Sequence, residues 1–452
     1  MKLNDIAEFV TDKISSSSIS LDRYVTTDSL LQNRRGRETA QNLPPMPCAL
    51  THYRQGDVLV ANIRPYLKKV WYADSEGGCS SDVLVFRAKN GHCSSFLYTV
   101  LMQDAFFNYA MSGAKGSKMP RGDKDQIMRY ELPTLTPMEE ENIGNMMVDI
   151  MSKINVNRQI NDNLEAMAKQ LYDYWFVQFD FPNEEGKPYK SSGGAMVWNE
   201  KLKREIPQGW YADNICKIAN ILSGGTPSKA VDDYWNNGTI PFFGPTDYNG
   251  NVFQIKTADH ITQKGLEHCA SSLFEEGIVI ITARGSIGKL VIVGTPMAMN
   301  QSCYALQSKE GEFEYLYFLT TQLIDCLKAK GSGSVFKSII ASDIEHSILC
   351  VAKENIVSDF CKKVKPLFEK LKTNTIEIAE LTKQRDELLP LLMNGQATVN
   401  YHLTDNLVFE CNHHHYRLYS CYLNLLFSFV SPTRWIYRTQ PDACGSRGIE
   451  WF

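Results

Sequence analysis

The chain has 452 residues, 43% of them hydrophobic and 22% charged, which is enough apolar material for a large core and argues against a disordered or fibrous protein. Its formal net charge of −4 excludes a bulk attraction to nucleic acid or anionic membranes, so contact with DNA would have to depend on local basic clusters. Twelve cysteines without a CxxC pair argue against a zinc ribbon or a disulfide scaffold and favour reduced thiols. The start has no signal-peptide pattern and no apolar run reaches the ~20 residues that cross a membrane, so we expect a soluble, cytoplasmic protein.

The segment 1–140 combines short apolar runs with a helical stretch. Residues 82–86 (DVLVF) are typical of a strand and residues 94–111 of a helix. The β-rich run GDVLVANIRPYLKKV at 56–70 ends in cations, and the glycine-containing stretch 113–129 is rich in lysine and arginine. Such stretches suit phosphate contacts while neighbouring side chains reach base edges, although a solvated basic loop explains them as well. The candidate DNA-binding residues here are Arg64, Lys68, Lys69, Lys115, Ser117, Lys118, Arg121 and Lys124.

After a linker-like stretch at 180–210, rich in Gly, Pro, Ser and charge, a second mixed unit begins. Residues 277–281 (GIVII) are typical of a strand. The Gly-Gly-Thr-Pro-Ser-Lys string at 224–229 is able to wrap a backbone, whereas Trp235, Phe242 and Phe243 are interpreted as core. The candidate DNA-binding residues of this half are Thr226, Ser228, Lys229, Arg284, Ser286, Lys289, Ser334 and Lys337.

A long helix is predicted at the end of each half. Apolar positions spaced alternately by four and three form the a/d seam of a coiled coil. The seam of the second helix is Leu367, Leu371, Asn374, Ile378, Leu381, Arg385, Leu388 and Leu392. Subtracting 217 from each of these numbers gives Ile150, Ile154, Asn157, Asn161, Leu164, Ala168, Leu171 and Trp175. A seam asparagine fixes register and partner, so we expect the two helices to pair, with two unrelated amphipathic helices as the alternative.

The chain also repeats itself outside the helices. Arg64 and Lys69 recur as Arg284 and Lys289 at an offset of 220 in the numbering (284 − 64 and 289 − 69), and Gly-Ser at 116–117 recurs as Gly-Ser at 333–334. Several matches in one order indicate a duplication of globular unit and helix. The string ITARGSIGKL at 281–290 is therefore a duplicated strand and turn, and its glycines, which have no counterparts at 65–68, are not what both halves need.

Catalytic motifs are not found in the sequence. ITARGSIGKL lacks the spacing of a phosphate-binding loop and has Leu290 where that loop carries a metal-binding hydroxyl. NLPPM at 42–46 departs from the base-binding element of adenine methyltransferases, and His260 and His268 have no partner at metal-ligand spacing. NHHHY at 412–416 could hold a metal only weakly. We therefore expect a duplicated binding module that is not an enzyme and binds no metal.

Several segments resemble the DNA-specificity subunit of type I restriction-modification systems. They are SGGTPSKAVDDYWNNGTIPFFGPTD (223–247), ARGSIGKL (283–290), MNQSCYAL (299–306), TIEIAELTKQRDELLPLLMNGQ (375–396), NVNRQINDNLEAMAKQLYDYWFVQF (155–179), GSKMPRGD (116–123) and VANIRPYLKKVW (60–71). The resemblance covers about residues 20–397. The first unit has no GGTP element, so its DNA contacts transfer only through 60–71 and 113–124.

The resemblance implies an α+β fold in which two mixed α/β target recognition domains are separated by two long antiparallel coiled-coil helices with a pseudo-two-fold repeat. The corresponding boundaries are 1–140 and 183–352 for the recognition domains, 141–182 and 353–396 for the helices, and 397–452 for the tail. It further implies that each domain reads half of a split double-stranded DNA site and that the helices dock adenine methyltransferase (modification) subunits. S-adenosylmethionine, ATP and Mg²⁺ would belong to the modification and restriction subunits, and this chain would carry no cofactor.

The tail at 401–452 contains no lysine and does not resemble the family, so we expect it to pack poorly or to form a small appendage. Two other functions stay open from the residues alone. One is a coiled-coil assembly scaffold whose two globular units bind proteins, and the other, more remote, is a nucleotide-dependent enzyme.

Overall fold

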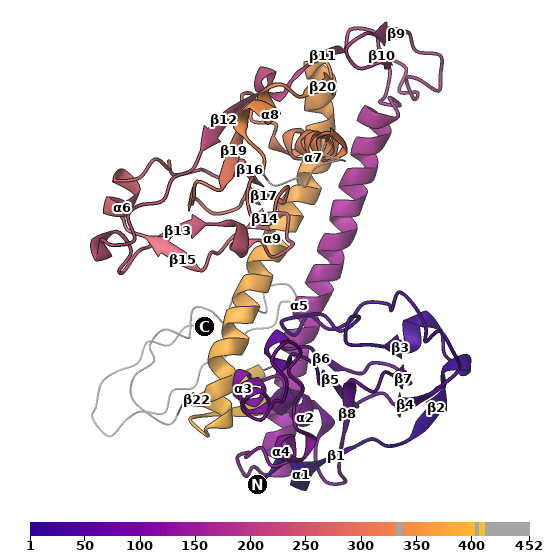
Figure 1. The fold of residues 1–452 in the computed structure, drawn as a ribbon, viewed down its shortest axis with the longest axis vertical. Helices are drawn as coiled ribbons and strands as arrows, with labels where there is room; N and C mark the ends of the chain where they lie inside the picture. Colours follow the sequence, from indigo (N-terminus) through magenta and orange to yellow (C-terminus); the bar gives the residue numbers. More distant parts are fainter. Residues whose placement is uncertain (331–337, 403–405, 412–452) are drawn as a thin grey trace. The chain divides into compact units, whose positions relative to one another are not determined.

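The computed structural model describes residues 1–330, 338–402 and 406–411 (Figure 1). Its described residues fall into two compact units. Unit 1 comprises Met1–Asn155 together with the chain from Leu381 onward, and unit 2 comprises Val156–Glu380. Two long helices, α5 (Pro137–Tyr172) and α9 (Glu354–Met393), contribute one end to each unit.

Unit 1 is built on a four-stranded antiparallel sheet in the order β1-β8-β5-β6. Its central strand β5 is a continuous apolar run, Val-Leu-Val-Ala, and all four side chains are buried, as expected for a strand covered on both faces. Helix α2 packs on β5, β6 and β8. The strands are β1 (Ala7–Phe9), β5 (Val58–Ala61), β6 (Val70–Tyr72) and β8 (Val83–Ala88).

A second sheet of unit 1 has the order β2-β4-β7-β3, with β3 parallel to β7. Its strands are β2 (Lys13–Ser15), β3 (Tyr24–Val25), β4 (Ala49–Tyr53) and β7 (Gly77–Cys79). The short helices of this unit are α1 (Leu3–Ile6), α2 (Ser94–Leu101), α3 (Asp104–Ser112) and α4 (Lys124–Ile127).

The prediction of a single helix at 94–111 is wrong in one respect, because the segment forms two helices, α2 and α3, with an interruption at residues 102–103. The carbonyl oxygen of Met102 accepts a hydrogen bond from Nε of Arg34, a residue far away in sequence. At the break, the carbonyl that a continuous helix would pair internally is thus bonded to a residue that the helical periodicity of the segment does not reveal.

Unit 2 contains a five-stranded sheet in the order β12-β19-β16-β17-β14, whose first four strands are antiparallel. This matches the order and directions of β1-β8-β5-β6 in unit 1, and the starts of β19 and β8 differ by 220 in the numbering (303 − 83). The strands are β12 (Ala219–Ser223), β14 (Phe253–Gln254), β16 (Val279–Thr282), β17 (Leu290–Val293) and β19 (Cys303–Ser308).

Unit 2 also contains a three-stranded sheet and two pairs of strands. A three-stranded sheet has the order β15-β13-β18, β9 pairs with β10, and β11 pairs with β20. The strands are β9 (Met196–Asn199), β10 (Arg204–Pro207), β11 (Tyr211–Asn214), β13 (Ile240–Phe243), β15 (Asp259–Ile261), β18 (Ala298–Met299) and β20 (Ile348–Val351). The helices are α6 (Gln263–Glu267), α7 (Phe313–Lys330) and α8 (Ala341–Glu345).

An aromatic cluster joins three helices within unit 2. Tyr172 at the end of α5 stacks on Phe318 of α7 with ring centroids 5.1 Å apart and meets Phe360 of α9 edge-on at 5.9 Å. All three side chains are buried. Because aromatic side chains bury large apolar areas, this cluster ties the helix ends to the sheet domain of the unit.

The two long helices contact each other within each unit. In unit 2, Asn157 Nδ2 donates to Glu377 Oε2 at 2.8 Å, and Asn374 Nδ2 donates to Asn161 Oδ1 at 2.9 Å. Residue numbers rise along α5 as they fall along α9, so the helices run antiparallel. In unit 1, buried Arg385 of α9 contacts the sulfur of Met151 of α5 at 3.5 Å.

The seam residues differ in burial. Asn157 and Asn374, which occupy matching positions of the repeat, do not bond to each other, because each meets a residue displaced along the antiparallel partner. The buried seam residues are Ile150, Ile154, Asn157, Ala168, Trp175, Leu371, Asn374, Ile378, Leu381, Arg385 and Leu392, and the half-buried ones are Asn161, Leu164, Leu171, Leu367 and Leu388.

The beginning of the tail is ordered against helix α5 in unit 1. Strand β21 (Ala397–His402) pairs with β22 (Asn406–Cys411), and Asn142 Nδ2 donates to the carbonyl of Val399 at 3.1 Å. Val399 is buried, and the hairpin that begins here continues into residues 401–402 and 406–411 of the tail. The expectations for residues 412–452, including NHHHY, lie outside the described residues.

Candidate nucleic-acid interface

In unit 1, the structure brings together the two loops from which DNA contacts were predicted. The amide of Arg64, just after β5, donates to the carbonyl of Pro120 at 2.7 Å. The amide of Gly122 donates to the carbonyl of Asn62 at 3.1 Å. The turn after β5 and the glycine-rich loop 113–122 therefore form one continuous surface.

Most predicted cations of this surface are exposed. Arg64, Ser117, Lys118 and Lys124 are exposed, and neither Lys118 nor Lys124 has an ion-pair partner among the residues that the structure describes. Lys115 pairs with Asp123 at 3.3 Å, and Arg121 pairs with Asp82 at 3.0 Å. Exposed pairs of this kind are weak, so both cations can exchange their carboxylate for a phosphate.

The adjacent Lys68 and Lys69 are engaged inside unit 1. Lys68 forms an ion pair with Asp104 at 2.8 Å, and Lys69 donates to the carbonyl of Thr27. Burial lowers the pKa of Lys69, with Arg64 adding a smaller repulsion and nearby carboxylates opposing both effects. Both lysines hold the turn in place while Arg64 points outward.

In unit 2, the Gly-Gly-Thr-Pro string is packed against the chain that follows β18. A Cβ atom added to Gly224 would lie 2.2 Å from the carbonyl oxygen of Asn300, and one added to Gly225 would lie 2.7 Å from the amide of Ala270. The hydroxyl of Thr226 bonds to the side chain of Gln301. Only glycine permits this approach, which explains why the string carries two of them.

The turn after β16 lies beside the same segment. The amide of Arg284 donates to the carbonyl of Ser302 at 3.2 Å, and Nζ of Lys289 lies 5.3 Å from the centre of the Tyr248 ring. Arg284, Ser286 and Lys289 are exposed. Loops 224–229, 244–248, 283–289 and 300–302 thus meet in one surface.

The other predicted residues of unit 2 have different surroundings. Ser228 and Lys229 are exposed, with Nζ of Lys229 lying 5.7 Å from the Trp235 ring. The interpretation of Phe242 and Phe243 as core is confirmed, because both are buried. The predicted contacts Ser334 and Lys337 lie outside the described residues.

The two turns that follow the matching strands have similar backbones. Gly285 and Gly288 have φ values of +76° and +73°, and Arg64 and Lys68 have φ values of +52° and +51°. The turn in each unit therefore uses two left-handed residues. At the offset of 220, Lys68 is the counterpart of Gly288 and shares its positive φ without being a glycine, whereas Gly285 corresponds to Pro65 and has no such counterpart.

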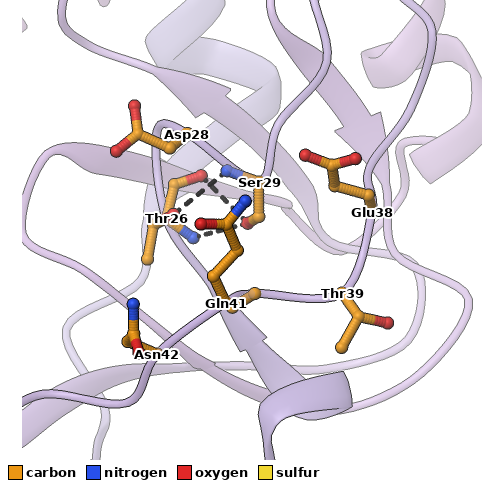
Figure 2. Close-up of a pocket in the computed structure, with 8 residues that line it drawn as sticks. Thr26, Asp28, Ser29, Glu38, Thr39, Gln41 and Asn42 are labelled. Atoms are coloured by element: carbon orange, nitrogen blue, oxygen red, sulfur yellow. Dashed lines mark hydrogen bonds between the residues drawn. The ribbon is translucent and has the colours of Figure 1, made fainter. Parts of the chain in front are cut away.

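A polar cavity of about 420 Å³ lies beside this surface in unit 1 (Figure 2). Thr26 and Ser29 hydrogen-bond to each other on one wall, and the carboxylates of Asp28 and Glu38 flank it. Seven of the eight residues that line it are polar or charged, whereas small-molecule pockets are lined mostly by hydrophobic side chains. Among the described residues no group of three His, Cys, Asp or Glu side chains could hold a metal ion, and no helix is long and apolar enough to cross a membrane.

Sequence reasoning missed one basic segment of unit 1. Loop 31–37 contains three closely spaced arginines, and its backbone bonds directly to the turn after β5. The amides of Asn33 and Arg34 donate to the carbonyls of Leu67 and Lys68 at 3.0 and 2.9 Å. The three closely spaced arginines could have indicated this loop, but the second half of the chain has no matching segment.

The chain is similar to proteins of one known family. Residues 207–379 match the family described as type I restriction modification DNA specificity domain. Over 372 residues, 81% of this chain and 83% of the relative, the chain is 26% identical to the type I restriction enzyme MjaIX specificity subunit of Methanocaldococcus jannaschii. It is 22% identical to the HindI specificity subunit of Haemophilus influenzae, covering 87% of this chain and 98% of that protein.

A solved structure agrees with this assignment at the level of the fold. The type I restriction-modification S subunit from M. genitalium superposes with a TM-score of 0.55 at 14% identity, covering 87% of this chain and 95% of that chain. The predicted resemblance to type I DNA-specificity subunits is confirmed by these similarities.

Proposed function

We propose that this chain is the DNA-recognition subunit of a type I restriction-modification complex, in which each globular unit reads one half of a bipartite site in double-stranded DNA. The observation that carries the proposal is the matched exposure of Arg64 and Arg284, each directly after the same strand of the same four-stranded order. A guanidinium is suited both to guanine, through two hydrogen bonds, and to phosphate.

The helices act as spacer and docking surface in this proposal. Their antiparallel contacts, with asparagines in the buried seam, have the features of a coiled coil that fixes register. The 36 residues of α5 and the 40 of α9 correspond to roughly 54 and 60 Å of helix. The repeated strand order and the helix starts, which differ by 217 in the numbering (354 − 137), favour a pseudo-two-fold arrangement of domains at 1–140 and 183–352.

The proposed subunit acts in the cytoplasm and carries out no chemistry itself. Adenine methyltransferase subunits with S-adenosylmethionine, and restriction subunits with ATP and Mg²⁺, would supply modification and cleavage. The candidate contacts of this chain are the sixteen DNA-binding residues predicted from its sequence, of which fourteen are described in the structure and two, Ser334 and Lys337, are not.

The experiment is to map methylated adenines in DNA exposed to the chain assembled with its methyltransferase partner. We expect a bipartite motif with a fixed gap, because two recognition surfaces belong to one chain. A continuous motif, or methylation without sequence preference, contradicts the proposal.

A binding series in increasing salt separates this function from that of a protein-assembly scaffold. Affinity for duplex DNA should fall steeply with salt as counterions are released from neutralised phosphates. Assembly with the methyltransferase subunit but no retention of DNA at any salt concentration would favour the scaffold.

A further inference from the structure

We propose that loop 31–37 is a third DNA-reading element of unit 1, in which Gln32, Asn33 and Arg35 contact base edges. This inference rests on the proposed function and extends it to residues that are not among the DNA contacts predicted from the sequence. The loop is a closed tip, because the amide of Leu31 donates to the carbonyl of Gly36 at 2.8 Å.

Two arginines anchor the loop from within. Arg34 is buried, and its guanidinium bonds to the carbonyl of Met102 and to the carboxylate of Asp104, which also pairs with Lys68. The guanidinium of Arg37 lies 4.5 Å from the centre of the Trp71 ring and donates to the carbonyl of Asp22 at 2.6 Å. These contacts order the loop before any ligand binds.

The exposed residues beside these anchors are those that read bases. Gln32, Asn33 and Arg35 are exposed at the tip. Arginine pairs with guanine and Asn or Gln with adenine through two hydrogen bonds each, so this set is suited to the major-groove edge of DNA. An anchored backbone presenting such side chains loses little freedom on binding.

Backbone strain is concentrated at the same place. In the described part of unit 1, the residues other than glycine with positive φ are Asn33 (+56°), Arg34 (+60°), Arg64 and Lys68. The first two bond through their amides to the turn that holds the other two. Costly conformations persist where the surroundings enforce them, and they cluster at functional sites. The loop and the Arg64 turn therefore form one preorganised surface.

The test uses the complete chain assembled with its methyltransferase partner and three duplexes. They carry the mapped site, the site with one half scrambled, and the site with the other half scrambled. Arg35→Ala removes the guanidinium from an exposed position. Asn33→Gly removes the side-chain amide, keeps the backbone N–H, and suits the left-handed backbone. Neither variant should unfold the protein. Arg23→Ala, which removes an exposed arginine of unit 1 paired with Glu76 at 3.9 Å, is the control.

We expect Arg35→Ala to weaken binding to the mapped site roughly 5- to 150-fold and to abolish discrimination at one half-site only. Asn33→Gly should reduce discrimination at that same half, and Arg23→Ala should change neither half. Equal weakening on all three duplexes would mean phosphate contact and overturn base reading, as would unchanged discrimination. If the unaltered protein itself fails to distinguish the duplexes, the proposed function fails.

Discussion

At the scale of single residues, the turns after β5 and β16 both contain residues with positive φ, but the residue types differ. The turn after β16 has positive φ at Gly285 and Gly288, whereas the turn after β5 has positive φ at Arg64 and Lys68, and of these only Lys68 and Gly288 are matched by the offset of 220. A side chain at such a position costs energy unless neighbouring contacts offset it. In unit 1 the carbonyl of Lys68 accepts from Arg34, and its amino group pairs with Asp104.

Gly288→Ala should therefore destabilise unit 2 more than its backbone angle alone requires. An added Cβ would lie 2.9 Å from Cγ2 of Ile324, in addition to the strain at φ +73°. Gly186→Ala is a matched control, because Gly186 has φ +75° and nothing within 4 Å of the added atom. We expect a loss of about 1–2 kcal/mol from the backbone in both and about 1–3 kcal/mol more at Gly288, measured by chemical denaturation. Equal losses would show that Ile324 gives way.

Glu312, just before α7, should make the stability of unit 2 depend on pH. Burial, followed by repulsion from Glu354 and other carboxylates, raises its pKa from 4.5 to about 7. The folded state thus favours the protonated form, so its stabilising contribution is complete below about pH 4.5 and is lost as the pH rises through about 7.

The measurement is thermal unfolding of Glu312→Gln and the unaltered protein between pH 5 and pH 8. The variant should gain stability relative to the unaltered protein as the pH rises. Glu275→Gln, which removes an exposed carboxylate of the same unit, controls for net charge. A constant difference across this range would contradict the shift.

At the scale of elements, the long helices combine an apolar seam with polar contacts. Leu371 and Asn374 are both buried, but the amide oxygen of Asn374 has no hydrogen-bond partner among the described residues while its nitrogen donates to Asn161. A buried polar group that is only partly satisfied costs stability, and such groups are used in helix pairs to fix register. The stability of the pair must therefore come from its apolar members.

Leu371→Ala should accordingly lower the free energy of unfolding of unit 2 by about 2–5 kcal/mol, because it leaves a cavity in the seam. Ile376→Ala on the same helix is the control, since Ile376 is 45% exposed whereas Leu371 is 2% exposed. Its cost should stay within about 0.5 kcal/mol. Similar losses for both variants would contradict the assignment of the seam.

At the scale of the whole molecule, each of the two compact units contains a loop surface with an exposed arginine, Arg64 in unit 1 and Arg284 in unit 2. The contacts that hold each surface join residues of the same unit. The units should therefore contribute to DNA binding independently, although one chain connects them.

Arg64→Ala and Arg284→Ala should each cost about 1–3 kcal/mol in binding the mapped site, each through a different half-site. The double variant should lose the sum of the two within about 0.5 kcal/mol, because sites without shared partners are additive. Binding of the assembled complex to the three duplexes measures both effects. Strong non-additivity would mean that the two surfaces read DNA as a single site.

The sequence by itself predicted the two long helices, the repeated strand and turn, and the resemblance to type I DNA-specificity subunits. Strand β5, the helix seam and the paired arginines were predictable because hydrophobic periodicity and recurring spacings are local properties of the chain. The interpretation of Phe242 and Phe243 as core followed from the same patterning.

Only the tertiary structure decided which loops meet. The break after Met102, the pairing of Asn374 with Asn161, and the contact of loop 31–37 with the Arg64 turn all join residues distant in sequence. Hydrophobic periodicity carries no information on such contacts, because they depend on how helices and strands that are distant in sequence pack together. The same reason explains why Lys68 could not be recognised as the counterpart of Gly288, whose backbone it shares through support from Arg34 and Asp104.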